Sequence, residues 1–183
     1  MPVIILLYGT NATGKSTLGR TIASLLPRCA FIEIDELRYK VVGGLVAYSA
    51  GKHPNTDPDE YRRQCWMGVE NAVRLAEGFS EHGFSSVIEG LDDECRPGTG
   101  WIEMHLGRYQ VLTVALLCRA DILSQRWQER GWGSSLPDRV FEELRWYRDH
   151  RTLFDCTLDT TTDLPEQGAE SVYKLCEKAL HVA

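Results

Sequence analysis

A lysine and a serine end a short, glycine-containing segment near the start of the chain. Residues 9–16 read GTNATGKS, which matches the spacing G-x-x-x-x-G-K-[ST]. In this spacing the glycines let the backbone wrap around an anion, the lysine reaches the β- and γ-phosphates of a nucleotide, and the hydroxyl ligates Mg²⁺. The motif therefore predicts a phosphate-binding loop, with Lys15 on the phosphates and Ser16 on the metal ion.

The segments on either side of this loop support that prediction. Residues 3–8 (VIILLY) form an apolar run short enough for a strand buried on both faces, and Pro27 ends a helical pattern that begins after Lys15. The loop thus leads into a helix N-terminus, whose unpaired N–H groups and dipole attract phosphate. The residues expected to hold the nucleotide are Gly9, Thr10, Asn11, Ala12, Thr13, Gly14, Lys15, Ser16 and Thr17.

The rest of the chain alternates between predicted strands and helices. We expect strands at 30–34, 84–88, 111–118 and 156–159, and helices at 57–82, 101–106, 121–130, 135–153 and 163–180. Asp57 and Pro58 begin the first of these helices, and Ser135 is expected to cap a later one. The alternation predicts an α/β, three-layer P-loop NTPase fold, with a five-stranded parallel sheet flanked by helices. No linker divides the chain, so we expect one domain over residues 1–183.

Carboxylates follow two of the predicted strands, at the edge of the sheet where ligands bind. Asp35 follows the second strand with Arg38 three residues further on, and Glu89 follows the third. We expect Asp35 to accept a proton from a substrate hydroxyl or to orient a Mg²⁺-bound water, and Arg38 to clamp a polar acceptor. A role for Asp35 as a helix cap alone is the alternative. Glu89 is expected either to assist Mg²⁺, as Asp92 could also do, or to bind the substrate.

Arginines surround a second glycine-containing segment. Arg126 and Arg130 lie one helical turn apart before residues 131–135 (GWGSS), and Arg139 follows that segment. Such arginines are typical of a lid that closes on a nucleotide and neutralises charge on the transferred group. We expect this lid at about 126–139, with a solvated basic face as the alternative. Residues 160–162 are expected beside the nucleotide base.

The composition is that of an ordinary soluble protein, with 43% hydrophobic and 25% charged residues. A net charge of −6 makes a general nucleic-acid partner unlikely on electrostatic grounds. We expect a cytoplasmic protein with no membrane partner, because no apolar run is long enough to span a bilayer and no signal peptide is recognisable. The six cysteines form no C-x-x-C pair and are expected to be free thiols.

Several segments together resemble those of the P-loop kinases: GTNATGKST, IDELR, the R-x-x-x-R pattern before the lid, and LDTT before the last helix. Within that group the chain is similar to the chloramphenicol phosphotransferase-like enzymes, chiefly over DPDEYRRQ, NAVRLAEGF and GFSSVIEGL, and it also resembles the kinase domain of polynucleotide kinases. The resemblance implies that Lys15 and Ser16 handle phosphates and Mg²⁺, and that Asp35 is the catalytic base. It also implies that Arg126 or Arg130 belongs to the lid.

These observations predict a kinase that uses ATP and Mg²⁺ to phosphorylate a hydroxyl group of a small molecule such as an antibiotic, a sugar or a nucleoside. Tyr48, Trp66 and Trp101 are candidates to line the acceptor pocket. One alternative is a polynucleotide 5′-hydroxyl kinase, which needs a basic, aromatic-lined channel. The other is a nucleotide-dependent regulatory protein without an acceptor, and the absence of an N-K-x-D motif argues against a GTPase of that kind.

Overall fold

The structure is a computed structural model that describes residues 1–46, 57–91 and 93–181. Its strands are β1 (Val3–Tyr8), β2 (Cys29–Glu33), β3 (Ser85–Glu89), β4 (Gln110–Leu117) and β5 (Cys156–Asp159). Its helices are α1 (Lys15–Leu25), α2 (Ile34–Arg38), α3 (Pro58–Glu81), α4 (Trp101–Leu106), α5 (Ala120–Glu129), α6 (Asp138–Asp149) and α7 (Pro165–His181). Short 3₁₀ turns lie at Asp93–Cys95 and Arg151–Leu153.

The strands form one parallel sheet in the order β2-β3-β1-β4-β5. β1 lies in the middle of the sheet, and all six of its residues are buried. Its neighbours are β3 on one side and β4 on the other, so the strand order reverses beside β1. In open parallel sheets ligands bind at such a reversal, beyond the carboxyl ends of the strands. The GTNATGKS loop leaves β1 at that point.

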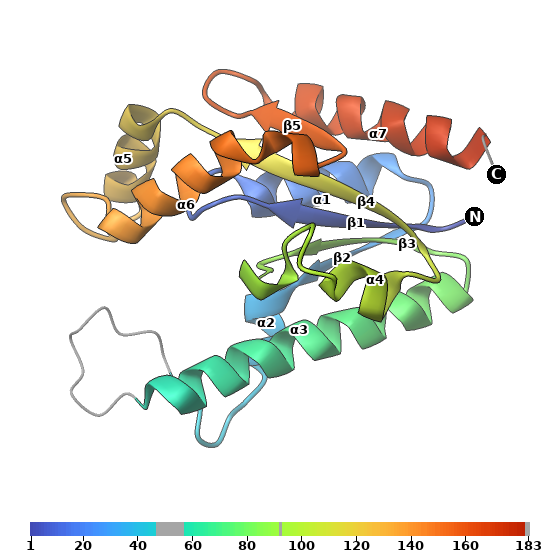
Figure 1. Ribbon diagram of the computed structural model, residues 1–183, viewed down its shortest axis with the longest axis horizontal. Coiled ribbons are helices and arrows are strands. Elements are labelled where there is room, and N and C mark those ends of the chain that lie inside the picture. The colour runs from blue at the N-terminus through green and yellow to red at the C-terminus, as the bar shows by residue number, and fades with distance from the viewer. Residues whose placement is uncertain (47–56, 92, 182–183) are drawn as a thin grey trace.

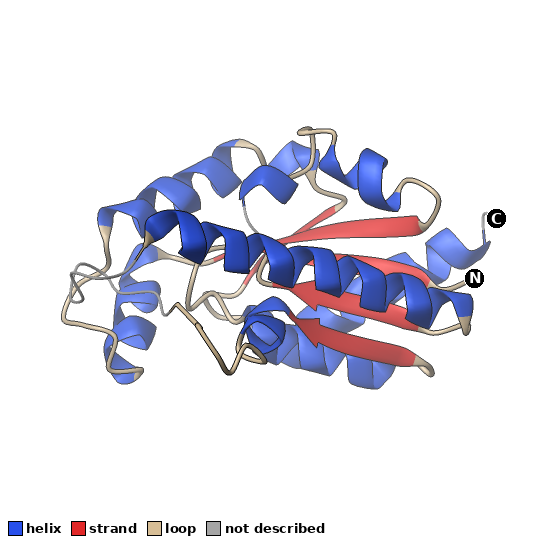
Figure 2. Ribbon diagram, turned by 90° about the horizontal axis from the view of Figure 1, so that it is seen from below, coloured by secondary structure: helices blue, strands red, loops and turns tan. Residues whose placement is uncertain are grey.

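Helices cover both faces of the sheet, which confirms the predicted three-layer fold (Figures 1 and 2). On one face, α1 and α7 pack against each other and against the sheet, with Leu18, Ile22 and Val172 fully or almost fully buried. On the other face, α3 and α4 pack through Val69 and Trp101. The sheet is therefore shielded from water on both faces, as the apolar sequence of β1 predicts.

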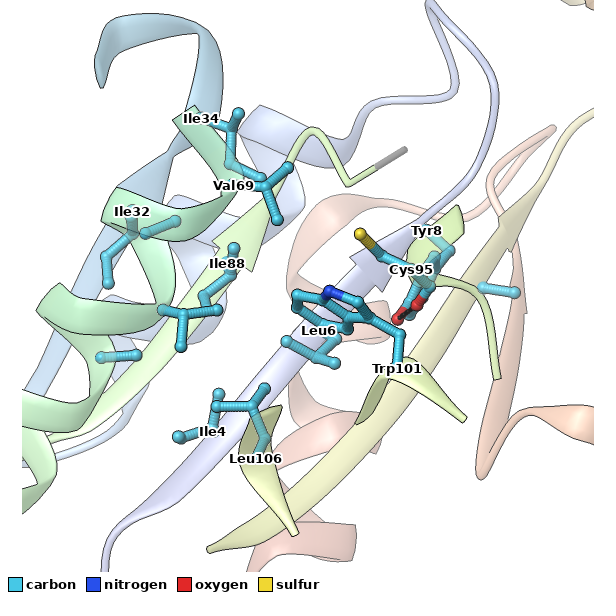
Figure 3. Close-up of a cluster of buried hydrophobic side chains, with 14 of the residues drawn as sticks. Ile4, Leu6, Tyr8, Ile32, Ile34, Val69, Ile88, Cys95, Trp101 and Leu106 are labelled. Atoms are coloured by element: carbon cyan, nitrogen blue, oxygen red, sulfur yellow. Dashed lines mark hydrogen bonds between the residues drawn. The ribbon is translucent and has the colours of Figure 1, made fainter. Parts of the chain in front are cut away.

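The core beneath α3 and α4 includes the buried hydroxyl group of Tyr8, which has a hydrogen-bond partner (Figure 3). Tyr8, at the end of β1, is buried, and its hydroxyl donates a hydrogen bond of 2.7 Å to the carbonyl oxygen of Cys95. This bond ties the segment after β3 to the end of β1. Trp101 belongs to the same cluster and is only 7% exposed.

Two predicted details are wrong and one is confirmed. The second strand, expected to reach residue 34, stops at Glu33, so Asp35 does not follow it directly but lies in the first turn of α2. Helix α2 begins at Ile34, one residue before Asp35, and the side chain of Ile34 is buried in the core. Ser135 does not cap α6, since that helix begins after Pro137. Asp57 does cap α3, accepting from the backbone N–H groups of residues 59 and 60.

α5 and α6 extend beyond the carboxyl ends of the strands (Figure 1). They share a small apolar cluster in which Trp127 of α5 packs with Leu136 and with Val140 of α6. Ala12 of the GTNATGKS loop belongs to the same cluster, so the two helices rest on that loop. None of the helices within the described ranges is long and apolar enough to cross a membrane.

Candidate active site

The GTNATGKS loop has the backbone of a tight anion cradle. Gly9, Ala12 and Gly14 all have positive φ, at 140°, 66° and 96°. Gly9 cannot be replaced without displacement, since a Cβ there would lie 2.8 Å from the carbonyl oxygen of Leu116. Thr13 holds the turn through a 2.7 Å hydrogen bond from its hydroxyl to the carbonyl oxygen of Thr10. The loop is thus fixed before α1 begins at Lys15.

Lys15 folds back over this loop. Its Nζ donates hydrogen bonds to the carbonyl oxygens of Gly9 at 2.8 Å and Thr10 at 3.1 Å. Burial lowers the pKa of Lys15, and the nearby carboxylates of Glu89, Glu143 and Asp35 oppose that shift. The positive charge of a further residue, Arg130, adds to the lowering of the Lys15 pKa. Four charged side chains, from β3, α6, α2 and the end of α5, therefore influence the pKa of Lys15.

Ser16 and Glu89 are in direct contact. The Ser16 hydroxyl donates a hydrogen bond of 2.9 Å to Oε1 of Glu89, the last residue of β3. Glu89 is only 6% exposed, and burial raises its pKa, while Lys15 and the Ser16 hydroxyl favour its ionised form. The predicted pair of oxygen groups, one from α1 and one from the end of β3, is thus brought together.

Asp35 and Arg38 lie on α2 in very different environments. The Asp35 side chain is 66% exposed, whereas the Arg38 side chain is 3% exposed. Arg38 Nε lies 3.5 Å from Oδ1 of Asp35, and Arg38 Nη1 donates a 2.9 Å hydrogen bond to the carbonyl oxygen of Val46. Its guanidinium also lies over the rings of Tyr39 and Tyr61, at 4.8 and 5.1 Å from their centroids. Arg38 is therefore held within the protein, and Asp35 is the accessible member of the pair.

The position of α2 depends on a close contact with α3. Gly68 of α3 faces Ile34 of α2, and a Cβ at Gly68 would lie 3.0 Å from Cγ2 and 3.2 Å from the carbonyl oxygen of Ile34. The absence of a side chain at Gly68 lets the two helices approach. Through this contact α3 determines where Asp35 lies.

A cavity of about 370 Å³ lies between the loop, α5 and the segment that follows β5. Its apolar wall includes Leu18, Leu158 and Leu164, and its polar wall includes Arg126, Arg130 and Thr160. This volume is in the usual range for small-molecule pockets. The predicted lid arginines and residue 160 are thus brought to one pocket.

The two lid arginines differ in how firmly they are held. Arg126 Nη2 donates a 2.7 Å hydrogen bond to the carbonyl oxygen of Thr160, and its Nη1 lies 3.5 Å from the carbonyl oxygen of Ala12. Thr160 in turn donates a 2.8 Å hydrogen bond to the carbonyl oxygen of Thr13. The guanidinium of Arg130 lies over the ring of Trp132, at 4.9 Å from its centroid. The guanidinium of Arg126 is thus held by backbone carbonyl groups, whereas that of Arg130 packs on the ring of Trp132.

The oxygen groups present fit Mg²⁺ held together with a nucleotide. Ser16 supplies a hydroxyl and Glu89 a buried carboxylate, and Mg²⁺ is usually bound through one or two carboxylates together with substrate phosphates and water. Within the described part of the chain, no group of three or more His, Cys, Asp or Glu side chains forms a self-sufficient metal site. Phosphate oxygens and water would therefore have to supply the remaining ligands of the metal ion.

Some predicted residues lie elsewhere, and some residues near the site carried no signal. Tyr48 and Asp92 lie outside the described residues. Trp101 is in the core and Trp66 packs against it, so both serve packing. Glu143 of α6 was missed, although its charge acts on Lys15, because nothing in the spacing of α6 points toward the loop. Glu33 was missed too, because it was expected inside a strand.

Comparisons with known proteins agree with this geometry. The profile of the chloramphenicol phosphotransferase-like proteins matches residues 2–177. Among solved structures, the tunicamycin resistance protein of Deinococcus radiodurans is similar, with a TM-score of 0.65, 17% identity and 96% of each chain covered. Shikimate kinase from Aquifex aeolicus has a TM-score of 0.61 and 17% identity over 98% of this chain and 99% of its own.

The APS kinase of Mycobacterium tuberculosis, solved with AMPPNP and APS, has a TM-score of 0.63 and 12% identity over 96% of this chain and 98% of its own. At such identities the likeness shows a shared fold. No curated protein matches the chain. Because the family profile covers nearly all of the sequence, the chain belongs to the chloramphenicol phosphotransferase-like family, and its fold is that of the P-loop kinases.

Proposed function

We propose that the protein is a kinase that transfers the γ-phosphate of ATP to a hydroxyl group of a small molecule. The observation that carries this proposal is the hydrogen bond between Ser16 and the buried carboxylate of Glu89 beside the loop, together with a second, accessible carboxylate, Asp35, on α2. A nucleotide-binding protein without an acceptor needs the first carboxylate for its metal ion. The second, on a separate helix and exposed, is what a hydroxyl acceptor requires.

In this proposal the cavity beside α5 receives the nucleotide base. Leu18, Leu158 and Leu164 offer an apolar surface for a ring, and Arg126 lies along the same cavity. The phosphates then follow the loop toward the N-terminus of α1, where free backbone N–H groups and the helix dipole favour negative charge. Lys15 exchanges its contacts with the Gly9 and Thr10 carbonyl groups for the phosphates.

Ser16 and Glu89 would hold Mg²⁺ or its bound water on the phosphates. When bound, the metal ion supplies charge neutralisation at the β- and γ-phosphates. Arg130, at the edge of the lid, is suited to approach the transferred group, because its guanidinium is not fixed by backbone carbonyl groups as that of Arg126 is. Arg126 and Arg130 would both neutralise charge that develops on the transferred group.

Asp35 would act as the general base. It accepts the proton of the acceptor hydroxyl as that oxygen forms a bond to the γ-phosphorus, and the bond to the bridging oxygen breaks to release ADP. Arg38 would orient Asp35 from within the protein and not clamp the acceptor, since its side chain is only 3% exposed. The lid at 126–139 and the single domain over 1–183 remain part of this proposal.

A small acceptor is favoured over a polynucleotide. The family is named for chloramphenicol, and the similar kinases are solved with shikimate or with APS. The net charge of −6 is unfavourable for a groove that follows a phosphate backbone. The acceptor is therefore sought among small hydroxyl compounds.

The test is steady-state ADP formation from ATP and Mg²⁺, measured with and without a panel of small hydroxyl compounds that includes chloramphenicol, shikimate and nucleosides. We expect at least one compound to raise the rate of ADP formation well above hydrolysis by water. A 5′-hydroxyl oligonucleotide that raises the rate when no small compound does would favour a polynucleotide kinase. ADP formation that no acceptor raises would contradict the proposal.

A further inference from the structure

Two glutamates lie side by side at the carboxyl end of the sheet. Glu33 is the last residue of β2 and Glu89 the last of β3, and the register of the parallel strands pairs these two positions. Side chains at paired positions of neighbouring strands point to the same face of a sheet.

Both glutamates are also held by α1. Ser16, in the first turn of α1, donates its 2.9 Å hydrogen bond to Oε1 of Glu89. Arg20 lies one turn further along, and its Nη2 donates a 2.6 Å hydrogen bond to Oε2 of Glu33. The Arg20 guanidinium also lies over the ring of Phe31, 4.7 Å from its centroid, which fixes its direction. Residues one turn apart on α1 thus hold the two carboxyl groups.

This arrangement limits where the Glu89 carboxyl group can point. One of its oxygens accepts from Ser16, and the neighbouring position of the sheet is occupied by Glu33, whose carboxyl group Arg20 holds. We propose that Glu33 is a positioning residue that aims the carboxylate of Glu89 at the metal ion, and that Arg20 holds Glu33 in place. The inference rests on the proposed function of Ser16 and Glu89 as the oxygen groups for Mg²⁺. Partners that orient a metal ligand typically change metal affinity by about 10–100-fold when they are removed.

A second ion pair in the chain provides a matched control. Arg108 Nη2 lies 2.9 Å from Oε1 of Glu77, with side-chain exposures of 67% and 25%. The Arg20–Glu33 pair has exposures of 64% and 21%. The pairs are alike in chemistry and exposure, but Glu77 has no part in the site. Glu77→Ala therefore measures the effect of losing a partly exposed ion pair that has no part in the site.

The experiment measures the dissociation constant of AMPPNP, a non-hydrolysable ATP analogue, by isothermal titration calorimetry over a series of Mg²⁺ concentrations, beginning in EDTA. The proteins are the wild type, Glu33→Ala, Glu33→Gln, Arg20→Ala and Glu77→Ala, each with a thermal melt. Mg²⁺ should tighten the binding of AMPPNP, and half of this effect is reached at a characteristic Mg²⁺ concentration. We expect Glu33→Ala to raise that concentration by about 10-fold or more. Affinity in EDTA and the melting temperature should change no more than in Glu77→Ala.

Glu33→Gln should stay close to the wild type, because its amide N–H can donate to Glu89 while its carbonyl oxygen accepts from Arg20. Arg20→Ala should shift the Mg²⁺ dependence in the same direction as Glu33→Ala, and it keeps the test intact if Glu33→Ala does not fold. An unchanged Mg²⁺ dependence in Glu33→Ala and Arg20→Ala would overturn the inference, as would an equal loss of affinity with and without Mg²⁺. A wild-type affinity that does not respond to Mg²⁺ at all would instead overturn the proposed function.

Discussion

The hydroxyl of Ser16 donates a hydrogen bond to Oε1 of Glu89 at 2.9 Å, joining two residues 73 positions apart in the chain. Ser16 lies in the first turn of the helix that follows β1, and Glu89 ends β3, which pairs with β1. The parallel register therefore brings the end of the motif and a buried carboxylate to one edge of the sheet. This contact organises the proposed metal site, and the predictions below examine the residues around it.

Lys15→Ala should reduce acceptor phosphorylation by about 10²-fold or more, the scale of losing a preorganised charged donor. The fold should persist, because the hydrogen bonds of Lys15 are to backbone carbonyl groups of its own loop and none joins it to another element of the described chain. Lys174→Ala is the control, since it removes an exposed lysine paired with Glu170 on α7. The measurement is kcat together with a thermal melt. Normal turnover in Lys15→Ala would remove the phosphate role of the loop.

Arg126→Ala and Arg130→Ala should have different kinetic effects. Arg126 is fixed in the wall of the cavity by the carbonyl oxygen of Thr160, so its loss should chiefly raise the KM for ATP. Arg130 is expected to act on the transferred group, so its loss should lower kcat by about tenfold or more with little change in KM. Steady-state kinetics with varied ATP provide the measurement. The same effect on KM and kcat in both variants would refute this division of roles.

Gly68→Ala should destabilise the protein and reduce activity together. The new methyl group would lie 3.0 Å from Cγ2 and 3.2 Å from the carbonyl oxygen of Ile34, so Ile34 must give way by a few tenths of an ångström, and we expect α2 to shift with Asp35. Overpacking of this kind typically costs about 1–3 kcal/mol. Gly78→Ala is the control on the same helix, where a Cβ meets nothing within 4 Å. It should stabilise the protein by about 0.5–1 kcal/mol. Denaturant unfolding and activity assays would show whether the two variants diverge in this way.

Glu89→Gln should make the metal-free protein more stable at neutral and alkaline pH. Burial raises the pKa of Glu89 in the folded state, so its ionisation opposes folding once the pH exceeds that pKa. As the pH falls below the unfolded pKa, wild-type Glu89 becomes protonated in both states and this cost disappears. The melting temperature of Glu89→Gln should thus exceed that of the wild type at about pH 8, and the difference should shrink toward about pH 4. A difference that stays constant with pH, or has the opposite sign at pH 8, would argue against the burial effect.

How far the sequence predicts the molecule depends on whether the signal is local. The GTNATGKS spacing and the apolar run of residues 3–8 identify the loop, its strand and its helix, because each signal lies within a few adjacent residues. The register that pairs Glu33 with Glu89 could not be predicted, because parallel pairing joins distant segments without a local marker. Ser135 looked like a helix cap, but burial of Leu136 against the α5–α6 cluster moved the helix start to the residue after Pro137.

Arg38 shows the same limit at the candidate site. Its spacing from Asp35 suggests a side chain that reaches toward an acceptor, and the structure places Arg38 Nε 3.5 Å from Oδ1 of Asp35. The spacing does not predict that Arg38 is buried against Tyr61 of α3 and bonded to Val46, because those contacts come from packing between helices. Sequence alone therefore suggested a clamp for the acceptor, whereas the structure presents an internal support for Asp35.

The most direct test of phosphate transfer with Asp35 as the base is ³¹P NMR of ATP, Mg²⁺ and the acceptor that raises ADP formation, with the wild type and Asp35→Asn compared. The account predicts a new phosphomonoester resonance that grows with ADP in the wild type, and growth slower by about 10²–10⁴-fold in Asp35→Asn, the usual range for loss of a general base. AMPPNP affinity and melting temperature should stay close to wild type, since the exposed Asp35 side chain bears on neither the nucleotide cavity nor the core. Inorganic phosphate as the sole product of the wild type, or a phosphomonoester formed equally fast by Asp35→Asn, would contradict it.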